Sequence, residues 1–78
     1  MTPTDARALV LAAITDVAPE LDPADIGDDD ELGADLDLDS IDFLRVVEAV
    51  AAAAGRNIPE ADYPQLSTLA TFSAYLTP

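Results

Sequence analysis

The sequence predicts an all-α fold, a small four-helix bundle of three longer helices and one short helix with a long first loop. Ala and Leu supply 25 of the 39 hydrophobic residues, and Val and Ile supply only nine, a composition that favours helices. Apolar residues recur at helical spacing in three segments, each bounded by residues that start or stop helices. With 78 residues, we expect residues 1–78 to form a single domain.

The first helix is expected to begin at Pro3. Thr2 is a suitable N-cap, Pro3 suits the first helical position, and Asp5 follows three residues after the cap. Pro19 and the residue before it should end the helix near Val17. One apolar stripe runs along it, formed by Leu9, Val10, Ala13, Ile14 and Val17.

Residues 18–39 show no sustained hydrophobic period and predict a long loop. Connections of this length in small domains usually have a function or are disordered. The segment Asp22-Pro23-Ala24-Asp25 is typical of one capped helical turn. Five apolar side chains should fix the loop to the core: Leu21, Ile26, Leu32, Leu36 and Leu38.

The clearest helix follows, with Asp39 as its N-cap and Gly55 as the residue after its C-terminal end. Its expected buried stripe is Phe43, Leu44, Val47, Val50, Ala51 and Ala54. After a connector, residues 59–66 can form a short helical piece limited by Pro64. Ser67 or Thr68 should cap a last helix, with Leu69, Phe72 and Leu76 on one face.

The charge balance restricts the possible partners. Three basic and 16 acidic residues give a net charge of −13, which argues against nucleic acid or an anionic membrane surface. Cationic protein surfaces are the expected partners, and self-repulsion favours a monomer. No apolar run suits a membrane span and no signal-peptide pattern opens the chain, so we expect a soluble, cytoplasmic protein.

The sequence contains few of the side chains that usually carry catalysis. It contains no Cys, His or Lys, which excludes disulfides, thiolate zinc sites and Schiff-base chemistry. Ser40 therefore has no His or Lys to act as its base and is not expected to be a nucleophile. We predict that the chain has no catalytic residues and is not an enzyme.

An acidic cluster raises the possibility of a calcium loop. Ten of the 16 acids lie between Asp22 and Asp42. EF-hand registers that begin at Asp28 or at Asp35 both place apolar residues at ligand positions. The cluster is therefore interpreted as a solvated acidic surface, and no metal site is expected.

The start of the second helix carries a family resemblance. On its own, Asp39-Ser40 is a typical helix start. The longer string Leu36-Asp37-Leu38-Asp39-Ser40-Ile41-Asp42 resembles the attachment region of acyl carrier proteins, whose pattern is roughly Leu-Gly-x-Asp-Ser-Leu-Asp. The resemblance covers nearly the whole chain, including the upstream Leu32 and the last helix.

The resemblance implies that Ser40 is a substrate. In that family a phosphopantetheinyl transferase moves 4′-phosphopantetheine from coenzyme A onto the serine hydroxyl, and the thiol of this arm carries an acyl group as a thioester. Asp39 matches the acid before the attachment serine. Ile41 and Asp42 match residues that contact partner enzymes, and Ile41 also lies outside the expected buried stripe.

Two positions depart from the family pattern. Asp37 stands where many members have Gly, and it can restrict which transferase accepts the chain. The second helix is also less acidic than is usual in fatty-acid carriers, and it contains Arg45, whose spacing allows weak ion pairs with Asp42 and Glu48. A cation here repels a basic partner residue placed opposite it, which favours a dedicated carrier in a specialised pathway.

Several alternatives stay open. The expected partners are the transferase, an acyl- or aminoacyl-loading ligase, and synthases or transferases with basic docking patches. The cargo is either a fatty or polyketide acyl group or an amino acid, and the small Ala-rich core favours a cargo that is not deeply enclosed. A different class of function is an unmodified acidic helical protein that binds or inhibits a basic partner.

Overall fold

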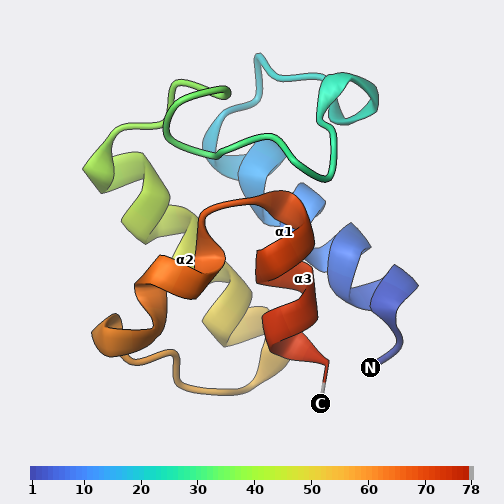
Figure 1. The fold of residues 1–78 in the computed structure, drawn as a ribbon, viewed down its shortest axis with the longest axis vertical. Coiled ribbons are helices and arrows are strands. Elements are labelled where there is room, and N and C mark those ends of the chain that lie inside the picture. Colours follow the sequence, from blue (N-terminus) through green and yellow to red (C-terminus); the bar gives the residue numbers. More distant parts are fainter. Residues whose placement is uncertain (78) are drawn as a thin grey trace.

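The computed structural model describes residues 1–77. It contains helices α1 (Pro3–Val17), α2 (Ser40–Ala54) and α3 (Leu69–Leu76), with a 3₁₀ turn η1 (Pro23–Asp25) and a 3₁₀ helix η2 (Glu60–Leu66) (Figure 1). Within these residues there is no strand, only an isolated bridge between Glu31 and Thr68. The predicted all-α class is confirmed, and none of the described helices combines the length and the apolar character that a membrane span needs.

Helix α1 packs against both α2 and α3, and α3 in turn packs against η2. The buried face of α1 is formed by Ala6, Val10, Ala13 and Ile14. The predicted stripe is therefore confirmed at Val10, Ala13 and Ile14. Leu9 and Val17 are only half-buried, and Ala6 is a further buried position. Ala at two of the four buried positions keeps this face small in volume, which permits close approach of the neighbouring helices.

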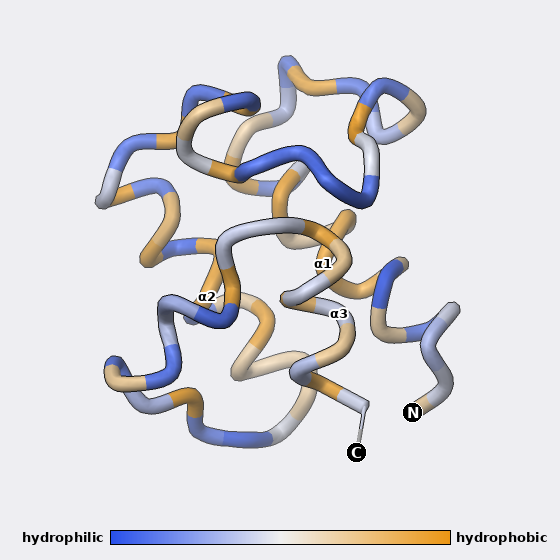
Figure 2. The backbone as a smooth tube through the Cα atoms, in the orientation of Figure 1, coloured by the Kyte–Doolittle hydropathy of each residue, from blue (hydrophilic) through white to orange (hydrophobic). Residues whose placement is uncertain are grey.

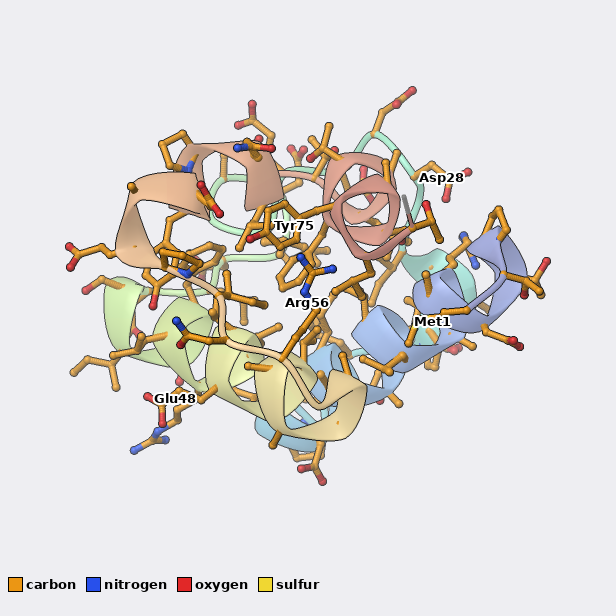
Figure 3. The ribbon with its side chains drawn as sticks, turned by 90° about the horizontal axis from the view of Figure 1, so that it is seen from below. Met1, Asp28, Glu48, Arg56 and Tyr75 are labelled. Atoms are coloured by element: carbon orange, nitrogen blue, oxygen red, sulfur yellow. The ribbon has the colours of Figure 1, made fainter. Side chains whose placement is uncertain are left out.

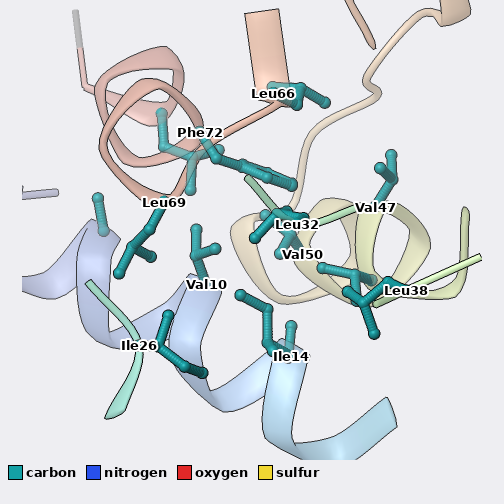
Figure 4. Packing of buried hydrophobic residues seen from close by; sticks show 14 of the residues in the cluster. Val10, Ile14, Ile26, Leu32, Leu38, Val47, Val50, Leu66, Leu69 and Phe72 are labelled. Atoms are coloured by element: carbon teal, nitrogen blue, oxygen red, sulfur yellow. The ribbon is translucent and has the colours of Figure 1, made fainter. Parts of the chain in front are cut away.

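The core receives side chains from every α-helix, from η2 and from the loop (Figure 4). Its largest fully buried side chains are Phe72, Ile14, Leu32, Leu66, Leu69, Val10, Val46, Val47 and Val50. Of the five predicted loop anchors, Ile26, Leu32 and Leu38 are buried, and Leu21 and Leu36 are half-buried. The loop is thus part of the folded core.

Helix boundaries follow the local signals in the sequence. Thr2 Oγ1 accepts a hydrogen bond from the Asp5 N–H at 3.1 Å and caps α1. Gly55 ends α2 with a φ of 66°, a left-handed conformation that Gly adopts without strain. The expected short helical piece is η2, and Pro64 lies inside it without ending it. The 3₁₀ helix continues to Leu66, whose side chain is fully buried.

The long loop of residues 18–39 docks on the start of α3. The Asp28 carbonyl accepts from the Ala70 N–H at 2.8 Å, and the Leu32 N–H donates to the Ser67 carbonyl at 2.9 Å. Arg7 of α1 also holds Asp28, with 2.6 Å between Nε and Oδ1. Figures 1 and 2 show this mostly hydrophilic loop crossing one end of the bundle.

The connector after α2, η2 and α3 meet around Tyr75. Its hydroxyl donates to Asp62 Oδ2 at 2.6 Å, and the guanidinium carbon of Arg56 lies 5.0 Å from the ring centroid (Figure 3). The hydrogen bond to Asp62 raises the pKa of Tyr75 above its ordinary value of 10.0, because the neutral phenol is the donor. These contacts join η2 and the connector to the last helix.

Candidate functional site

The N-terminus of α2 is capped but only partly closed. Asp39 has an extended backbone, and its Oδ1 accepts from the Asp42 N–H at 2.8 Å. The Asp39 carbonyl accepts from the Phe43 N–H at 2.9 Å. Within residues 1–77, the N–H groups of Ser40 and Ile41 have no hydrogen-bond partner. Two backbone donors at the positive end of the helix dipole therefore face solvent.

Ser40 is the first residue of α2 and is exposed. In the described part of the chain its hydroxyl takes part in no hydrogen bond. The neighbouring Asp39 carboxylate is already occupied as the helix cap. The site thus presents an accessible hydroxyl beside two open amides, without a positioned general base.

The segment before Ser40 is held by alternating burial. Leu38 is buried and its N–H donates to the Leu32 carbonyl at 3.2 Å, whereas Asp37 is exposed. Asp37 has a φ of 59°, in the left-handed region. Gly takes this conformation freely, and Asp is among the few other residues that tolerate it. The backbone therefore explains why Gly suits this position in the pattern that the sequence resembles.

Two apolar side chains are exposed on the first turns of α2. Ile41 is 62% exposed, as its position outside the stripe predicted, and Leu44 is 41% exposed. The prediction that Leu44 is buried was wrong: Val46 is buried instead, because the buried face of α2 is centred on Val46, Val47 and Val50. The signal that points to Leu44 is its spacing from Ile41, since residues three apart lie side by side on a helix.

One cation lies among the acids of this surface. Arg45 Nη1 is 4.0 Å from Asp42 Oδ1, and the Arg45 side chain is 68% exposed. The predicted ion pair between Arg45 and Glu48 was wrong, since within residues 1–77 these two side chains form no salt bridge. Arg45 thus remains largely available to a partner.

The structure brings all six predicted site residues to one end of α2 or the loop leading into it: Asp37, Asp39, Ser40, Ile41, Asp42 and Arg45. Leu44 joins them as an addition that sequence reasoning did not include. No group of three metal-ligating side chains is assembled within residues 1–77. The arrangement suits covalent modification of a hydroxyl by another protein rather than catalysis by the chain itself.

Comparison with known families agrees with this geometry. A family model described as "Phosphopantetheine attachment site" matches residues 8–76, which include the loop, α2, η2 and α3. A comparison with curated proteins gave no match. Because the family model matches nearly the whole chain, the chain belongs to the phosphopantetheine attachment site family.

Proposed function

We propose that the chain is a dedicated acyl or aminoacyl carrier whose 4′-phosphopantetheine arm is attached to Ser40. The family is one of carriers that bear this arm covalently and are not enzymes. The observation that supports the position is the exposed Ser40 hydroxyl at the open N-terminus of α2. The proposal includes residues 1–78 as one carrier domain, monomeric and cytoplasmic as predicted from the sequence.

The residues at this helix start fit the group. A phosphodiester on Ser40 would lie beside the open N–H groups of Ser40 and Ile41, which suit an anion. These donors matter because Asp37, Asp39 and Asp42 add negative charge nearby. When attached, the arm supplies a thiol, which a chain without Cys otherwise lacks.

The first turns of α2 provide a surface for partner enzymes. Ile41 and Leu44 form an exposed apolar centre, and Asp42, Arg45 and Glu48 surround it. Apolar centres with charged rims are typical of protein interfaces. A basic docking patch complements the acids, and charge attraction of this kind speeds association more than it tightens binding. The partners that we propose are the transferase, a loading ligase and a synthase or transferase.

Arg45 supports the assignment to a specialised pathway. A partner that places Lys or Arg opposite this position is repelled, whereas a partner with an acid there gains a pair. We expect Arg45→Glu to be used better than the parent by carrier-dependent enzymes of housekeeping fatty-acid synthesis. Arg56→Glu makes the same charge change far from Ser40 and serves as the control, with its folding checked by circular dichroism. Equal use of the parent and the housekeeping carrier would contradict a dedicated role.

The decisive experiment measures intact mass after incubation with coenzyme A, Mg²⁺ and a broad-specificity phosphopantetheinyl transferase. The parent should gain one phosphopantetheine and Ser40→Ala none. Ser67→Ala is the matched control, because Ser67 is also an exposed serine and its replacement should leave the gain unchanged. A gain in Ser40→Ala would place the arm elsewhere. No gain with several transferases on helical protein would favour the alternative, an unmodified acidic binding protein.

The nature of the cargo is the next question for the modified protein. Fatty or polyketide acyl groups and amino acids would all use the same thiol. Incubating the modified chain with acyl donors and, separately, with aminoacyl-activating ligases distinguishes the two classes by mass. Loading by one class alone would assign the pathway type.

A further inference from the structure

We propose that the cargo of this carrier stays outside the helical bundle and that the partner enzyme supplies its binding pocket. The inference rests on the proposed attachment at Ser40. It follows from an aromatic pair, Phe43 and Tyr63, which closes the space between α2 and η2 next to that serine. A carrier of this kind suits short or polar acyl and aminoacyl groups.

The aromatic pair lies where an arm on Ser40 would reach the interior. Phe43 is one helical turn after Ser40, and α1 covers another face of α2. The Phe43 and Tyr63 ring centroids are 5.9 Å apart with an interplanar angle of 77°, a favourable edge-to-face geometry. Both side chains are half-buried, so the pair forms the rim of the core on this side.

Tyr63 is restrained from both sides along the chain. The preceding Asp62 accepts the hydrogen bond of the Tyr75 hydroxyl at 2.6 Å. The following Pro64 fixes its own φ and limits the backbone of Tyr63. The backbone that carries the Tyr63 ring is thus tied to α3 through Asp62, and the ring itself packs on Phe43.

Behind the pair the core is filled. Val47, Leu66 and Phe72 are at most 2% exposed, and Figure 4 shows Phe72 pointing from α3 toward Leu32 and Val50. Close-packed side chains admit an extra chain only by moving. An acyl chain on the arm therefore meets packed side chains behind the rim.

Two surface pockets of residues 1–77 lie away from this rim. One is lined by residues of α1, the loop and α3, among them Arg7, Asp28 and Ser73. The other is lined by residues of η2 and α3, among them Tyr75. No residue of α2 lines either pocket, so neither one opens beside Ser40 to receive the cargo.

The closed rim restricts the class of cargo. A long alkyl chain that cannot enter the bundle remains in water, which is unfavourable in proportion to its apolar area. Short or polar groups avoid this penalty. They also leave the thioester accessible, so the partner enzyme can bind the cargo directly.

The test uses the full chain loaded at Ser40 by the transferase with butyryl-, octanoyl- or dodecanoyl-coenzyme A. The readouts are the rate of thioester cleavage by hydroxylamine, relative to the same acyl-coenzyme A, and the melting temperature. We expect relative rates and melting temperatures that do not depend on chain length. Progressively slower cleavage and higher melting temperature with longer chains in the parent would overturn the inference.

A variant pair tests the role of the aromatic rim. Tyr63→Ala opens it and should slow cleavage of the dodecanoyl thioester several-fold, whereas Tyr63→Phe keeps the ring and should behave as the parent. If folded Tyr63→Ala leaves the thioester as exposed as in the parent, the pair is not what closes the bundle. Should Tyr63→Ala not fold, the chain-length series on the parent decides. Failure to load counts against the proposed function, whereas loading followed by protection counts against this inference alone.

Discussion

Helices α2 and α3 both begin with a capping side chain, yet their N-termini differ in what else is bound there. At α3, Thr68 Oγ1 accepts from the Thr71 N–H at 3.1 Å, Thr71 Oγ1 accepts from the Thr68 N–H at 3.2 Å, and the Asp28 carbonyl accepts from the Ala70 N–H at 2.8 Å. At α2, by contrast, one side-chain hydrogen bond is made within residues 1–77, in which the Asp39 carboxylate accepts from the Asp42 N–H.

The long loop causes this difference. It docks its backbone on the start of α3, and then leads into α2 without covering that helix's first amides. Open N–H groups are tolerated at a helix end that faces water. The start of α3 therefore binds the loop, whereas the start of α2 keeps N–H groups that suit an anionic group.

The largest effect on stability is expected at the start of α3, where Thr68 is the cap. Thr68→Ala removes the acceptor for the Thr71 N–H and should lower the free energy of unfolding by about 1–2 kcal/mol. Urea denaturation followed by circular dichroism measures it. Thr68→Ser keeps the cap and should stay near the parent. An unchanged stability in Thr68→Ala would mean that the loop alone holds this end.

A smaller loss of stability is expected at the start of α2, where Asp39 is the cap. Asp39→Ala should lower the free energy of unfolding by about 1 kcal/mol, because one capped amide is lost. Asp39→Asn keeps a capping oxygen and should retain the stability while removing the charge. Comparing transferase rates on folded Asp39→Asn and the parent then isolates the effect of charge on modification. A large destabilisation by Asn would show that the charge, not the cap, holds the helix.

Asp37 should respond in the opposite direction. Its left-handed φ of 59° strains a residue with a Cβ, so Asp37→Gly should raise the free energy of unfolding by about 0.5–1 kcal/mol. Asp29→Gly removes the same charge from the same loop, at a position without a positive φ, and should give no gain. Equal gains from both variants would assign the effect to charge repulsion.

The ion pair between Arg7 and Asp28 should have a modest, salt-dependent effect. Both side chains are substantially exposed, so Arg7→Ala should cost about 0.2–1 kcal/mol at low salt and less at high salt. Hydrogen exchange of the Ala70 amide, which bonds to the Asp28 carbonyl, should become faster. Exchange that is unaffected by the variant or by salt would show that the backbone bonds hold the loop unaided.

The smallest effect concerns Tyr75, at the end of the molecule far from Ser40. Because its folded-state pKa is raised above 10.0, its contribution to stability is present below pH 10 and is lost as the pH rises through the folded pKa. Tyrosinate absorbance should show that Asp62→Ala lowers this pKa. An unchanged titration would mean that Asp62 is not the cause of the shift.

Local signals in the sequence predicted the helix boundaries well. Thr2, Asp39, Gly55 and Thr68 lie at the ends expected for them, because caps act on amides or carbonyls within one turn. The exposure of Ile41 was predicted by the family resemblance together with helical periodicity, although the periodicity wrongly placed Leu44 in the buried stripe. The attachment at Ser40 itself rests on the family resemblance and stays a prediction.

Features that depend on distant neighbours could not be predicted. Whether Leu44 or Val46 is buried depends on where α1 lies around α2, and the apolar pattern of α2 permits both orientations. The bond between the Asp28 carbonyl and the Ala70 N–H joins main-chain groups, and since every residue carries the carbonyl and every residue but Pro carries the N–H, no side chain signals it. The left-handed backbone of Asp37 is likewise set by how Leu36 and Leu38 flank it.

The docking of the loop on α3 also has a consequence for the order of folding. Asp28 and Leu32 bind main-chain groups of Ala70 and Ser67, which are far away in sequence, so the entropy of closing a long segment opposes these contacts. We therefore expect the segment that leads into Ser40 to take its final path only after the start of the last helix has formed. Helix α3 contributes none of the predicted site residues, yet the loop that leads into Ser40 depends on its contacts with the start of α3.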